Sequence, residues 1–520
     1  MNMREAVAEL LRRRDEIKKM GGDDKVRKQH ERGKLTARER LAHFFDDGAF
    51  VEIGIHGTQM GGNEHDKPPA DAVVCGWGKV DGRMVCAAAY DFTVKGGSIG
   101  LTGETKVTRL RELSLRNRVP MVWFIDSAGA RIDPSQASSG NDLMSMFAGT
   151  GHLFREEVIM SGVVPLVAAM VGPGAAGTAY IPGLADFVPM VKNIGSMALG
   201  GPPLVKAVTG QDITEQELGG SKIHCETSGV GDVEVPDDAA CIRTIKDYLA
   251  FFPSHCEEKP PIVANNDPVT RRDEVLLDVL PESTRQSYDM YKIVQSVVDD
   301  GRILDLKPKW ARSMITCLGR IGGRPCGVVA NNPRHLGGIL ANDAADKAAR
   351  FIQLCDAFNI PLVFLMDVPG FMVGSKVEHE GIIRHGAKML HAMASATVPK
   401  LTVVVRKGYG AGYYVMAGRA YEPDLLVAWP GAEISVMGAE GMVGIAGKKL
   451  FGGTEPPPEV KQQIVSMLQK HIDIYRVAGL GLIDDVIDPR DTRPLLAMAL
   501  ELSWNKKVER PFRKHGIMPV

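Results

Sequence analysis

Val119-Pro-Met-Val-Trp-Phe-Ile-Asp-Ser-Ala-Gly129 returns 241 residues later in the chain as Ile360-Pro-Leu-Val-Phe-Leu-Met-Asp-Val-Pro-Gly370. The same offset relates further positions, without a gap: Gly78 and Gly319, Gly96-Gly97 and Gly337-Gly338, Lys106 and Lys347. Solenoid repeats have periods of roughly 20–50 residues, so a period of this length indicates two homologous domains. We therefore expect the chain to carry two similar sites, one in each half.

The length of 520 residues exceeds what one hydrophobic core usually supports, which favours two or three domains. A stretch rich in proline and charge, Phe252-Pro-Ser-His-Cys-Glu-Glu-Lys-Pro-Pro261, is typical of a linker. We place the domain boundary there, with domains of residues 1–255 and 256–520. The hydrophobic and charged fractions, 44% and 24%, are ordinary for a globular protein, and the formal net charge of -1 gives no reason to expect nucleic-acid binding.

The eight cysteines form no Cys-x-x-Cys pair, and several, such as Cys75 and Cys317, lie in apolar runs. This favours reduced, buried thiols in a cytoplasmic protein over disulfides or a zinc site, so we expect no bound metal. No hydrophobic stretch approaches the ~18–20 residues of a membrane span, and the N-terminus lacks a signal-peptide core. The charged residues 1–40 predict a solvated helical arm or, alternatively, an edge that attracts phosphate.

Short apolar strands alternate with helical patterns in both halves. The first half is predicted to contain strands 73–80 and 84–90 joined by an Asp-Gly turn, a helix at 106–117, and strands 121–125 and 164–171. The second half is predicted to contain strands 326–330, 362–366 and 401–405 and helices 344–358 and 381–394. This order predicts an α/β fold with mostly parallel crossovers.

A glycine-rich turn follows one apolar strand in each half, and these turns are the candidate sites. The first reads Gly172-Pro-Gly-Ala-Ala-Gly177 and the second Gly408-Tyr-Gly-Ala-Gly412. A turn that opens a helix exposes free backbone N–H groups at the positive end of the helix dipole. Two such N–H groups can hold a developing oxyanion, which favours reactions that pass through an enolate.

The first turn also matches the dinucleotide-binding pattern G-x-G-x-x-G. That pattern requires an Asp or Glu about 20 residues further on, where this chain reads Val191-Lys-Asn-Ile-Gly-Ser196. The second turn lacks the pattern altogether. A nicotinamide or flavin site is therefore disfavoured.

No side chain stands out as a general base. His379-Glu380 lacks metalloprotease spacing, and His385 and His391 fit a helix surface or an interface. The duplication of Asp126 as Asp367 favours a structural role, such as helix capping, over acid–base chemistry. This pattern suggests a reaction in which a cofactor supplies the base and the protein supplies backbone amides.

Further motifs lie throughout the chain: Gly33-Lys-Leu-Thr-Ala-Arg-Glu-Arg-Leu41, Asp91-Phe-Thr-Val-Lys-Gly-Gly97, Asp343-Ala-Ala-Asp-Lys-Ala-Ala-Arg-Phe351 and Gly381-Ile-Ile-Arg-His-Gly-Ala-Lys388. With the doubled pattern, they make the chain similar to the carboxyltransferase (beta) subunits of biotin-dependent acyl-CoA carboxylases of the propionyl- and methylcrotonyl-CoA type. The resemblance covers essentially the whole chain. It implies two tandem crotonase-like domains that arose by internal duplication.

The resemblance also implies the roles of the two halves. The N-terminal domain would bind the acyl-CoA and the C-terminal domain the carboxybiotin. Carboxybiotin would release CO₂, biotin would take the acyl α-proton, and the acyl enolate would attack CO₂. The implied site residues are the oxyanion holes at Ala176-Gly177, for the thioester enolate, and at Ala411-Gly412, for the biotin ureido oxygen, with substrate contacts at Gly96, Gly97, Tyr180 and Tyr414.

The same resemblance implies partners. The chain has no Ala-Met-Lys-Met biotinylation motif, so biotin would be carried on a separate protein. A biotin carboxylase and a biotin carboxyl carrier, together forming an alpha subunit, are the expected partners. The expected assembly is a homo-oligomer with a dimer as the minimum and a hexamer as the usual state. The alternatives are a carboxyltransferase subunit of a sodium-pumping decarboxylase and a non-catalytic CoA-binding paralogue.

Two departures leave the substrate open. Many members of the family have Gly where this chain has Ala176. Tyr414 stands where propionyl-CoA enzymes have Asp and acetyl-CoA enzymes have a small aliphatic residue, and the stretch 409–421 looks more like methylcrotonyl- or geranyl-CoA subunits. The acyl group, the direction of the reaction and the residues that contact the CoA phosphates therefore stay open.

Overall fold

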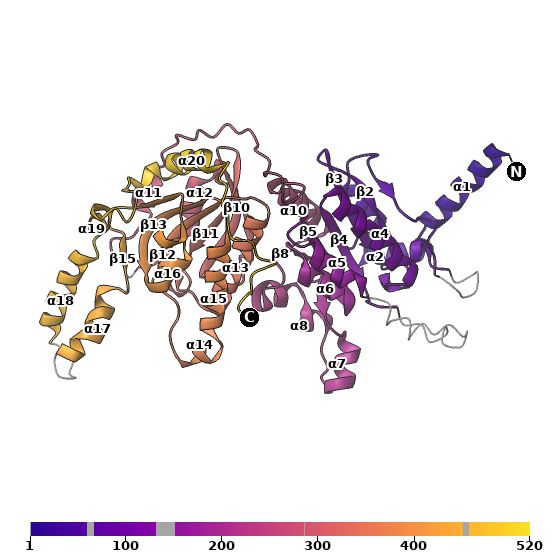
Figure 1. The fold of residues 1–520 in the computed structure, drawn as a ribbon. Coiled ribbons are helices and arrows are strands. Elements are labelled where there is room, and N and C mark those ends of the chain that lie inside the picture. The colour runs from indigo at the N-terminus through magenta and orange to yellow at the C-terminus, as the bar shows by residue number, and fades with distance from the viewer. Residues whose placement is uncertain (1, 60–66, 132–150, 285, 451–456) are drawn as a thin grey trace. The chain divides into compact units, whose positions relative to one another are not determined.

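The computed structural model describes residues 2–59, 67–131, 151–284, 286–450 and 457–520. The chain divides into two compact units, Met1–Glu258 and Lys259–Val520, close to the boundary that the linker composition predicted (Figure 1). Each unit is built on its own sheet and is described by itself.

The strands of the first unit are β1 (Val51–Glu52), β2 (Val73–Val80), β3 (Arg83–Tyr90), β4 (Met121–Ser127), β5 (Leu166–Ala175), β6 (Pro189–Val191), β7 (Ser196–Ala198) and β8 (Val233–Val235). Its helices are α1 (Met3–Lys18), α2 (Asp23–Glu31), α3 (Ala37–Phe44), α4 (Leu101–Asn117), α5 (His152–Met160), α6 (Gly177–Leu184), α7 (Pro202–Thr209), α8 (Glu215–Gly219), α9 (Ser221–Ile223) and α10 (Asp238–Phe251).

The strands of the second unit are β9 (Leu304–Leu306), β10 (Met314–Ile321), β11 (Arg324–Asn331), β12 (Leu362–Val368), β13 (Lys400–Tyr409), β14 (Leu425–Ala428), β15 (Glu433–Ser435) and β16 (Asp485–Val486). Its helices are α11 (Val275–Asp278), α12 (Met290–Val297), α13 (Asn342–Ala357), α14 (Ser375–His379), α15 (Ile382–Ser395), α16 (Gly410–Val415), α17 (Ala439–Leu450), α18 (Pro458–His471), α19 (Ile474–Gly479) and α20 (Thr492–Ser503).

The two sheets have the same topology. In the described residues, the first sheet runs β1-β2-β3-β4-β5-β6-β8, with β7 paired to β5, and the second runs β9-β10-β11-β12-β13-β14-β16, with β15 paired to β13. In each sheet the first three strands are antiparallel and the others are parallel. The duplication read from one stretch of sequence therefore extends over the whole sheet, and the predicted mostly parallel α/β architecture is confirmed.

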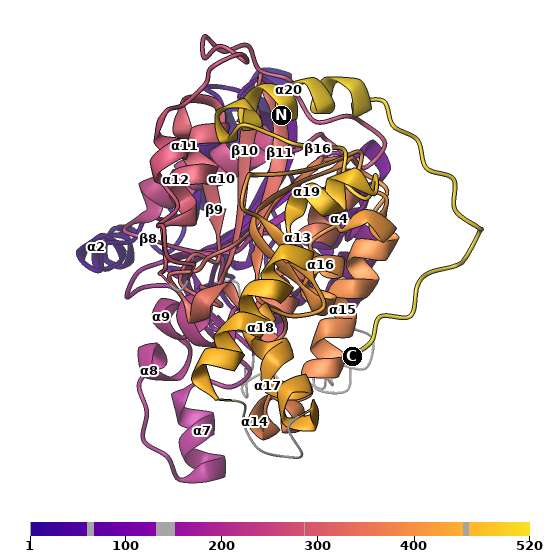
Figure 2. The ribbon, with the colours of Figure 1, turned by 90° about the vertical axis from the view of Figure 1, so that its left-hand side faces the viewer.

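Helices cover the sheets by burying one apolar face. In the first unit, Val107 and Leu110 of α4 and Leu153 and Met160 of α5 pack into the core formed with β2 to β5. In the second unit, residues of α12 and α20 pack into a core formed with β10 to β14. The helices α13 and α15 contact each other, as the view onto the second unit shows (Figure 2).

Both glycine-rich segments begin as strand, which the sequence did not predict. β5 continues through Gly172 to Ala175, and β13 continues through Gly408 to Tyr409. A short partner strand makes each extension possible, because Gly174 pairs with Met197 of β7 and Gly408 with Ile434 of β15. The turn in each unit is therefore shorter than predicted, and it lies directly before the following helix.

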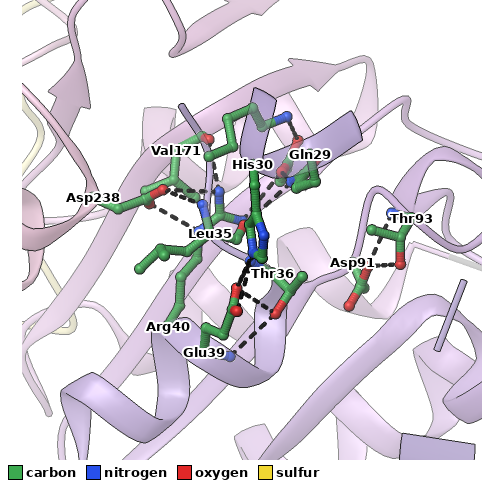
Figure 3. Close-up of polar contacts among 12 residues, drawn as sticks. Gln29, His30, Leu35, Thr36, Glu39, Arg40, Asp91, Thr93, Val171 and Asp238 are labelled. Carbon is green, nitrogen blue, oxygen red and sulfur yellow. Dashed lines mark hydrogen bonds and ion pairs between the residues drawn. The ribbon is translucent and has the colours of Figure 1, made fainter. Parts of the chain in front are cut away.

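The charged N-terminal arm is solvated along α1, which has no buried residue, but the prediction of a solvated arm is wrong for the residues that follow. Lys34 and Arg40 are buried, and both approach Asp126 at the end of β4, with N···O distances of 2.6 and 3.1 Å. Arg40 also binds Asp238 of α10 at 2.9 Å (Figure 3). The arm thus supplies counter-charges to the interior of the first unit.

The duplicated aspartates hold ion pairs and do not cap helices. Asp126 is fully buried and also accepts a hydrogen bond from Gln29 at 2.7 Å. Asp367, equally buried, accepts from the Tyr288 hydroxyl at 2.9 Å and from Arg406 at 3.0 Å. A carboxylate at a buried strand end needs a cation and hydrogen-bond donors, so the structural role is confirmed and the capping role is wrong.

The duplicated lysines are buried as well. Lys106 donates from its ammonium group to the backbone oxygens of Ala70 at 2.9 Å and Val73 at 2.7 Å. Lys347 likewise donates to the oxygens of Lys307, Trp310 and Met314. In each unit the lysine therefore ties the helix after the Gly-Gly pair to the loop that enters the sheet.

We predict that Lys106→Met lowers the free energy of unfolding by about 1–3 kcal/mol, because the two carbonyl oxygens lose a charged donor in a buried position. Lys79→Met is the matched control, since Lys79 is exposed on β2. Urea unfolding followed by circular dichroism measures both variants. A Lys106→Met protein as stable as the wild type would contradict the role of this lysine.

Glu157 of α5 supplies a pH-dependent test. It is buried, and within the described ranges both of its carboxylate oxygens lack a hydrogen-bond partner. Burial raises the pKa of Glu157 to about 8, so the folded state favours the neutral acid. This stabilising preference is complete below the unfolded pKa of about 4.3 and is lost as the pH rises through the folded pKa. We therefore expect Glu157→Gln to gain stability over the wild type between about pH 5 and pH 8, by up to about 1.4 kcal/mol per pH unit, in unfolding curves measured across that range. Parallel curves for the two proteins would rule out the burial of a titrating carboxyl.

Candidate active site

The first turn presents one backbone amide. Ala176 links β5 to α6 with a φ of 51°, a conformation that is costly for a residue with a Cβ. Its N–H donates to the Ala198 carbonyl at 3.1 Å, and the role of the pair Ala176-Gly177 stays a prediction. The N–H of Gly177 has no acceptor in the described part of the chain, and it lies at the first position of α6, where the helix dipole is positive.

The second turn presents two backbone amides. Gly410, with a φ of 57°, begins α16, and the N–H groups of Ala411 and Gly412 meet no acceptor in the residues that the structure describes. Val164-Pro165 and Val398-Pro399 set an offset of 234 residues between the two turns. By that offset Ala176 corresponds to Gly410, which shares its positive φ, and Gly177 corresponds to Ala411. The donor common to both turns is therefore the amide of Gly177 and of Ala411.

Two apolar side chains lie close to Gly177. A Cβ built on Gly177 would meet Phe154 Cζ at 3.7 Å and Ile99 Cδ1 at 3.9 Å. The ring of Phe154 contacts the ring of Tyr180 edge to face, with centroids 5.4 Å apart. A hydrogen bond to a developing negative charge is stronger where water is excluded. Phe154 carries no motif in the sequence, and only its place on the neighbouring helix reveals it.

Tyr414 lies beside the second turn, at the position that the 234-residue offset equates with Tyr180. Both tyrosines are 49% exposed, so neither ring is buried in the hydrophobic core. Tyr414 stacks on Tyr421 with centroids 6.4 Å apart and meets Tyr413 edge to face. The structure thus places the predicted residues Tyr180 and Tyr414 next to the turns predicted to be catalytic.

Gly96 and Gly97 have a structural explanation in addition to the predicted substrate contact. Gly97 is buried with a φ of 64°, and a Cβ there would collide with the Asp126 carbonyl oxygen. Gly338 repeats this arrangement against the carbonyl oxygen of Asp367, at 2.8 Å. Gly96 is half-buried, and its carbonyl accepts the Ala128 N–H at 2.9 Å. The fold accounts for Gly97, and the substrate contacts stay predictions.

The three histidines lie on α14 and α15. His379 is exposed at the end of α14, and His391 is half-buried on α15. His385 also lies on α15, and its Nδ1 is 2.8 Å from Asp346 of α13. The predicted helix position of His385 and His391 is confirmed.

Among the described residues, no group of three or more His, Cys, Asp or Glu side chains could hold a metal ion. None of their helices combines the length and apolar composition that crossing a membrane requires.

Comparisons with known proteins agree with this architecture. The family model described as carboxyl transferase domain matches residues 28–518. The methylmalonyl-CoA carboxyltransferase 12S subunit of Propionibacterium freudenreichii subsp. shermanii is 43% identical over 517 residues, which cover 99% of this chain and 97% of that protein. The methylmalonyl-CoA decarboxylase subunit alpha of Veillonella parvula is 40% identical, with 100% and 99% covered. The carboxyltransferase subunit of propionyl-CoA carboxylase from Haloferax mediterranei is 39% identical, with 100% of both chains covered.

A solved structure shows the same fold. The crystal structure of the transcarboxylase 12S subunit, described as a hexamer assembly with methylmalonyl-coenzyme A and methylmalonic acid bound, matches with a TM-score of 0.93 at 41% identity. The match covers 100% of this chain and 99% of that chain. The predicted pair of crotonase-like domains is thereby confirmed. Since the family model spans nearly the whole chain and full-length relatives are about 40% identical, this chain belongs to the carboxyl transferase family.

Proposed function

We propose that the chain is the carboxyltransferase subunit that moves a carboxyl group from carboxybiotin on a carrier protein to the α (or vinylogous) carbon of an acyl-CoA. The observation that carries this proposal is the pair of equivalent turns. Each has, within the described residues, a backbone amide without an acceptor at a helix start and an exposed tyrosine beside it. A carboxyl transfer between two carbonyl-type substrates requires two oxyanion sites. The duplicated domain supplies two.

The first turn fits an acyl thioester. The Gly177 amide donates to the thioester oxygen and stabilises the negative charge that this oxygen gains when the α-proton leaves. Phe154 and Ile99 lie 3.7 and 3.9 Å from the position of a Cβ on Gly177, so the side chains closest to this position are apolar. Neither of these neighbouring side chains can accept the proton, so the reaction depends on a base from outside this turn.

The second turn fits the ureido group of biotin. In the described residues, the amides of Ala411 and Gly412 are hydrogen-bond donors without an acceptor, and the ureido oxygen would be an acceptor that gains negative charge once the carboxyl group leaves. Bound biotin supplies the carboxyl group and the base for the α-proton. The chain's own part is to hold the two oxygens and to shield them.

The proposal includes partners. The absence of an Ala-Met-Lys-Met motif in the sequence means that a separate protein must carry the biotin, together with a biotin carboxylase as the alpha subunit. A homo-hexamer is the proposed assembly, because the 12S relative is described as a hexamer. All eight cysteines are free and seven are buried, which supports a cytoplasmic location.

The direction of transfer has two candidates. Relatives include propionyl-CoA carboxylase subunits and a methylmalonyl-CoA decarboxylase subunit alpha. Reconstitution with biotin carboxylase and a biotinylated carrier separates them. ATP-dependent fixation of bicarbonate onto propionyl-, acetyl- or methylcrotonyl-CoA supports the carboxylase direction. Loss of CO₂ from methylmalonyl-CoA to biotin, without any fixation, establishes the decarboxylase reading. Transfer in neither direction would refute the proposed function.

We predict that Gly177→Pro lowers kcat by about 10²–10³-fold, the effect of removing one oxyanion donor. Proline is tolerated at the first position of a helix, so the loss of the N–H is the main change. Gly177→Ala is the matched control, because it keeps the N–H and its Cβ would meet its neighbours at 3.7 Å or more. We expect it to retain far more turnover than Gly177→Pro in the same fixation assay.

Ala411→Pro applies the same test to the second turn. Gly412 is less suitable, because a Cβ there would lie 2.7 Å from Val368. His385→Ala should cost far less than either proline variant. A Gly177→Pro protein of normal oligomeric size with full turnover would contradict the mechanism, and so would a folded but inactive His385→Ala protein.

Tyr414 is predicted to select among acyl groups. Tyr414→Ile should change the relative kcat/KM for acetyl-, propionyl- and methylcrotonyl-CoA by about 10–200-fold, the range associated with one methylene in an apolar pocket. Tyr475→Ile is the control, since Tyr475 is also exposed, at 59%, but lies on α19. Equal losses for all three substrates would assign Tyr414 a structural role.

A further inference from the structure

Phe154 occupies a position at which the two halves of the chain differ in chemistry. The 234-residue offset aligns α5 with part of α15 and matches Phe154 with Lys388. Lys388 pairs with Asp346 at 3.2 Å, and Asp346 also binds His385. The same fold therefore accepts a charged side chain at this point of the helix. An aromatic ring there is not a requirement of the crotonase-like framework.

The core does not explain Phe154 either. Its side chain is 36% exposed, whereas Leu153 and Met160 of the same helix are 4% and 1% exposed and form the core. The ring instead contacts Tyr180 edge to face, and its Cζ lies 3.7 Å from the position of a Cβ on Gly177. An exposed ring in such a place gains its full burial only when an apolar ligand covers it.

We infer that Phe154 is a specificity-determining residue that contacts the acyl chain and sets which hydrocarbon group the first turn accepts. This inference rests on the proposed function. A thioester oxygen that binds the Gly177 amide lies about 2.9 Å from its nitrogen. The acyl carbons next to that oxygen then extend into the corner between Phe154, Tyr180 and Ile99. In the described chain, no charged group lies within 4 Å of a Cβ built on Gly177.

Comparison of three variants tests this role in the reconstituted complex. Phe154→Ala removes the wall and Phe154→Leu keeps part of it. Val158→Ala changes a residue one helical turn further along α5 that is 59% exposed. The readout is kcat/KM for acetyl-, propionyl- and butyryl-CoA. We expect Phe154→Ala to alter the ratios between these substrates by about tenfold or more, Phe154→Leu to alter them less, and Val158→Ala to leave them unchanged.

A binding measurement keeps the inference separate from turnover. Calorimetric titration of each protein with propionyl-CoA and with CoA gives the affinity that the acyl group adds. Phe154→Ala should reduce this ratio, and Val158→Ala should not. An unchanged ratio, with equal losses of kcat/KM for all acyl-CoAs, would overturn the role of Phe154 while leaving the proposed function intact. A wild-type protein that transfers no carboxyl group in either direction would overturn the proposed function, and the role of Phe154 in this reaction would fail with it.

Discussion

A buried carboxylate at the end of the central parallel strand is the constraint on which both units depend. Asp126 and Asp367 each need a cation, and the two units meet this need differently. In the second unit the cation is Arg406, on the adjacent strand β13. The matching position in the first unit is Gly172, where any Cβ would collide with the Asp126 side chain. The glycine leaves room for Lys34 and Arg40, which come from the N-terminal arm.

The anchored strand end positions the chemistry. Ser127 of β4 pairs with Gly174 of β5, and Val368 of β12 pairs with Gly408 of β13, so each turn starts from a strand end held by the buried ion pair. The turn then passes through one residue with positive φ and opens a helix. In the described residues, the two turns differ in the number of backbone amides without an acceptor and in the side chains that lie beside them. A common frame with different walls is a physical basis for two sites that hold different carbonyl compounds.

Local sequence patterns predicted most of the strands and turns but few of the side chains that line the candidate site. The hairpin of β2 and β3, the apolar strands and the helix-opening turns follow from spacing, because their partners are near in sequence. The hydrogen bond from the Ala176 N–H to the Ala198 carbonyl depends on β7, and no apolar run in the sequence predicts this strand. The partners of Asp126 lie 86 to 97 residues away, so neither the ion pairs nor the buried state of Lys34 could be read from the sequence. The contrast between Phe154 and Lys388 follows from the equivalence of α5 with part of α15, which local sequence patterns did not predict.

The different sources of the counter-charge make the two halves unequal as modules. In the described residues, the cationic and amide partners of Asp126 are Gln29, Lys34 and Arg40, and all three precede the first strand of the sheet. A first half that began at β1 would therefore keep its complete sheet and still enclose a bare carboxylate. In the second half the cation is Arg406, which lies on β13 of the same sheet. That half therefore does not depend on a preceding segment for its counter-charge. The two halves share their strands through duplication. Removal of the segment before the first strand would nevertheless take the cations away from the buried aspartate only in the first half.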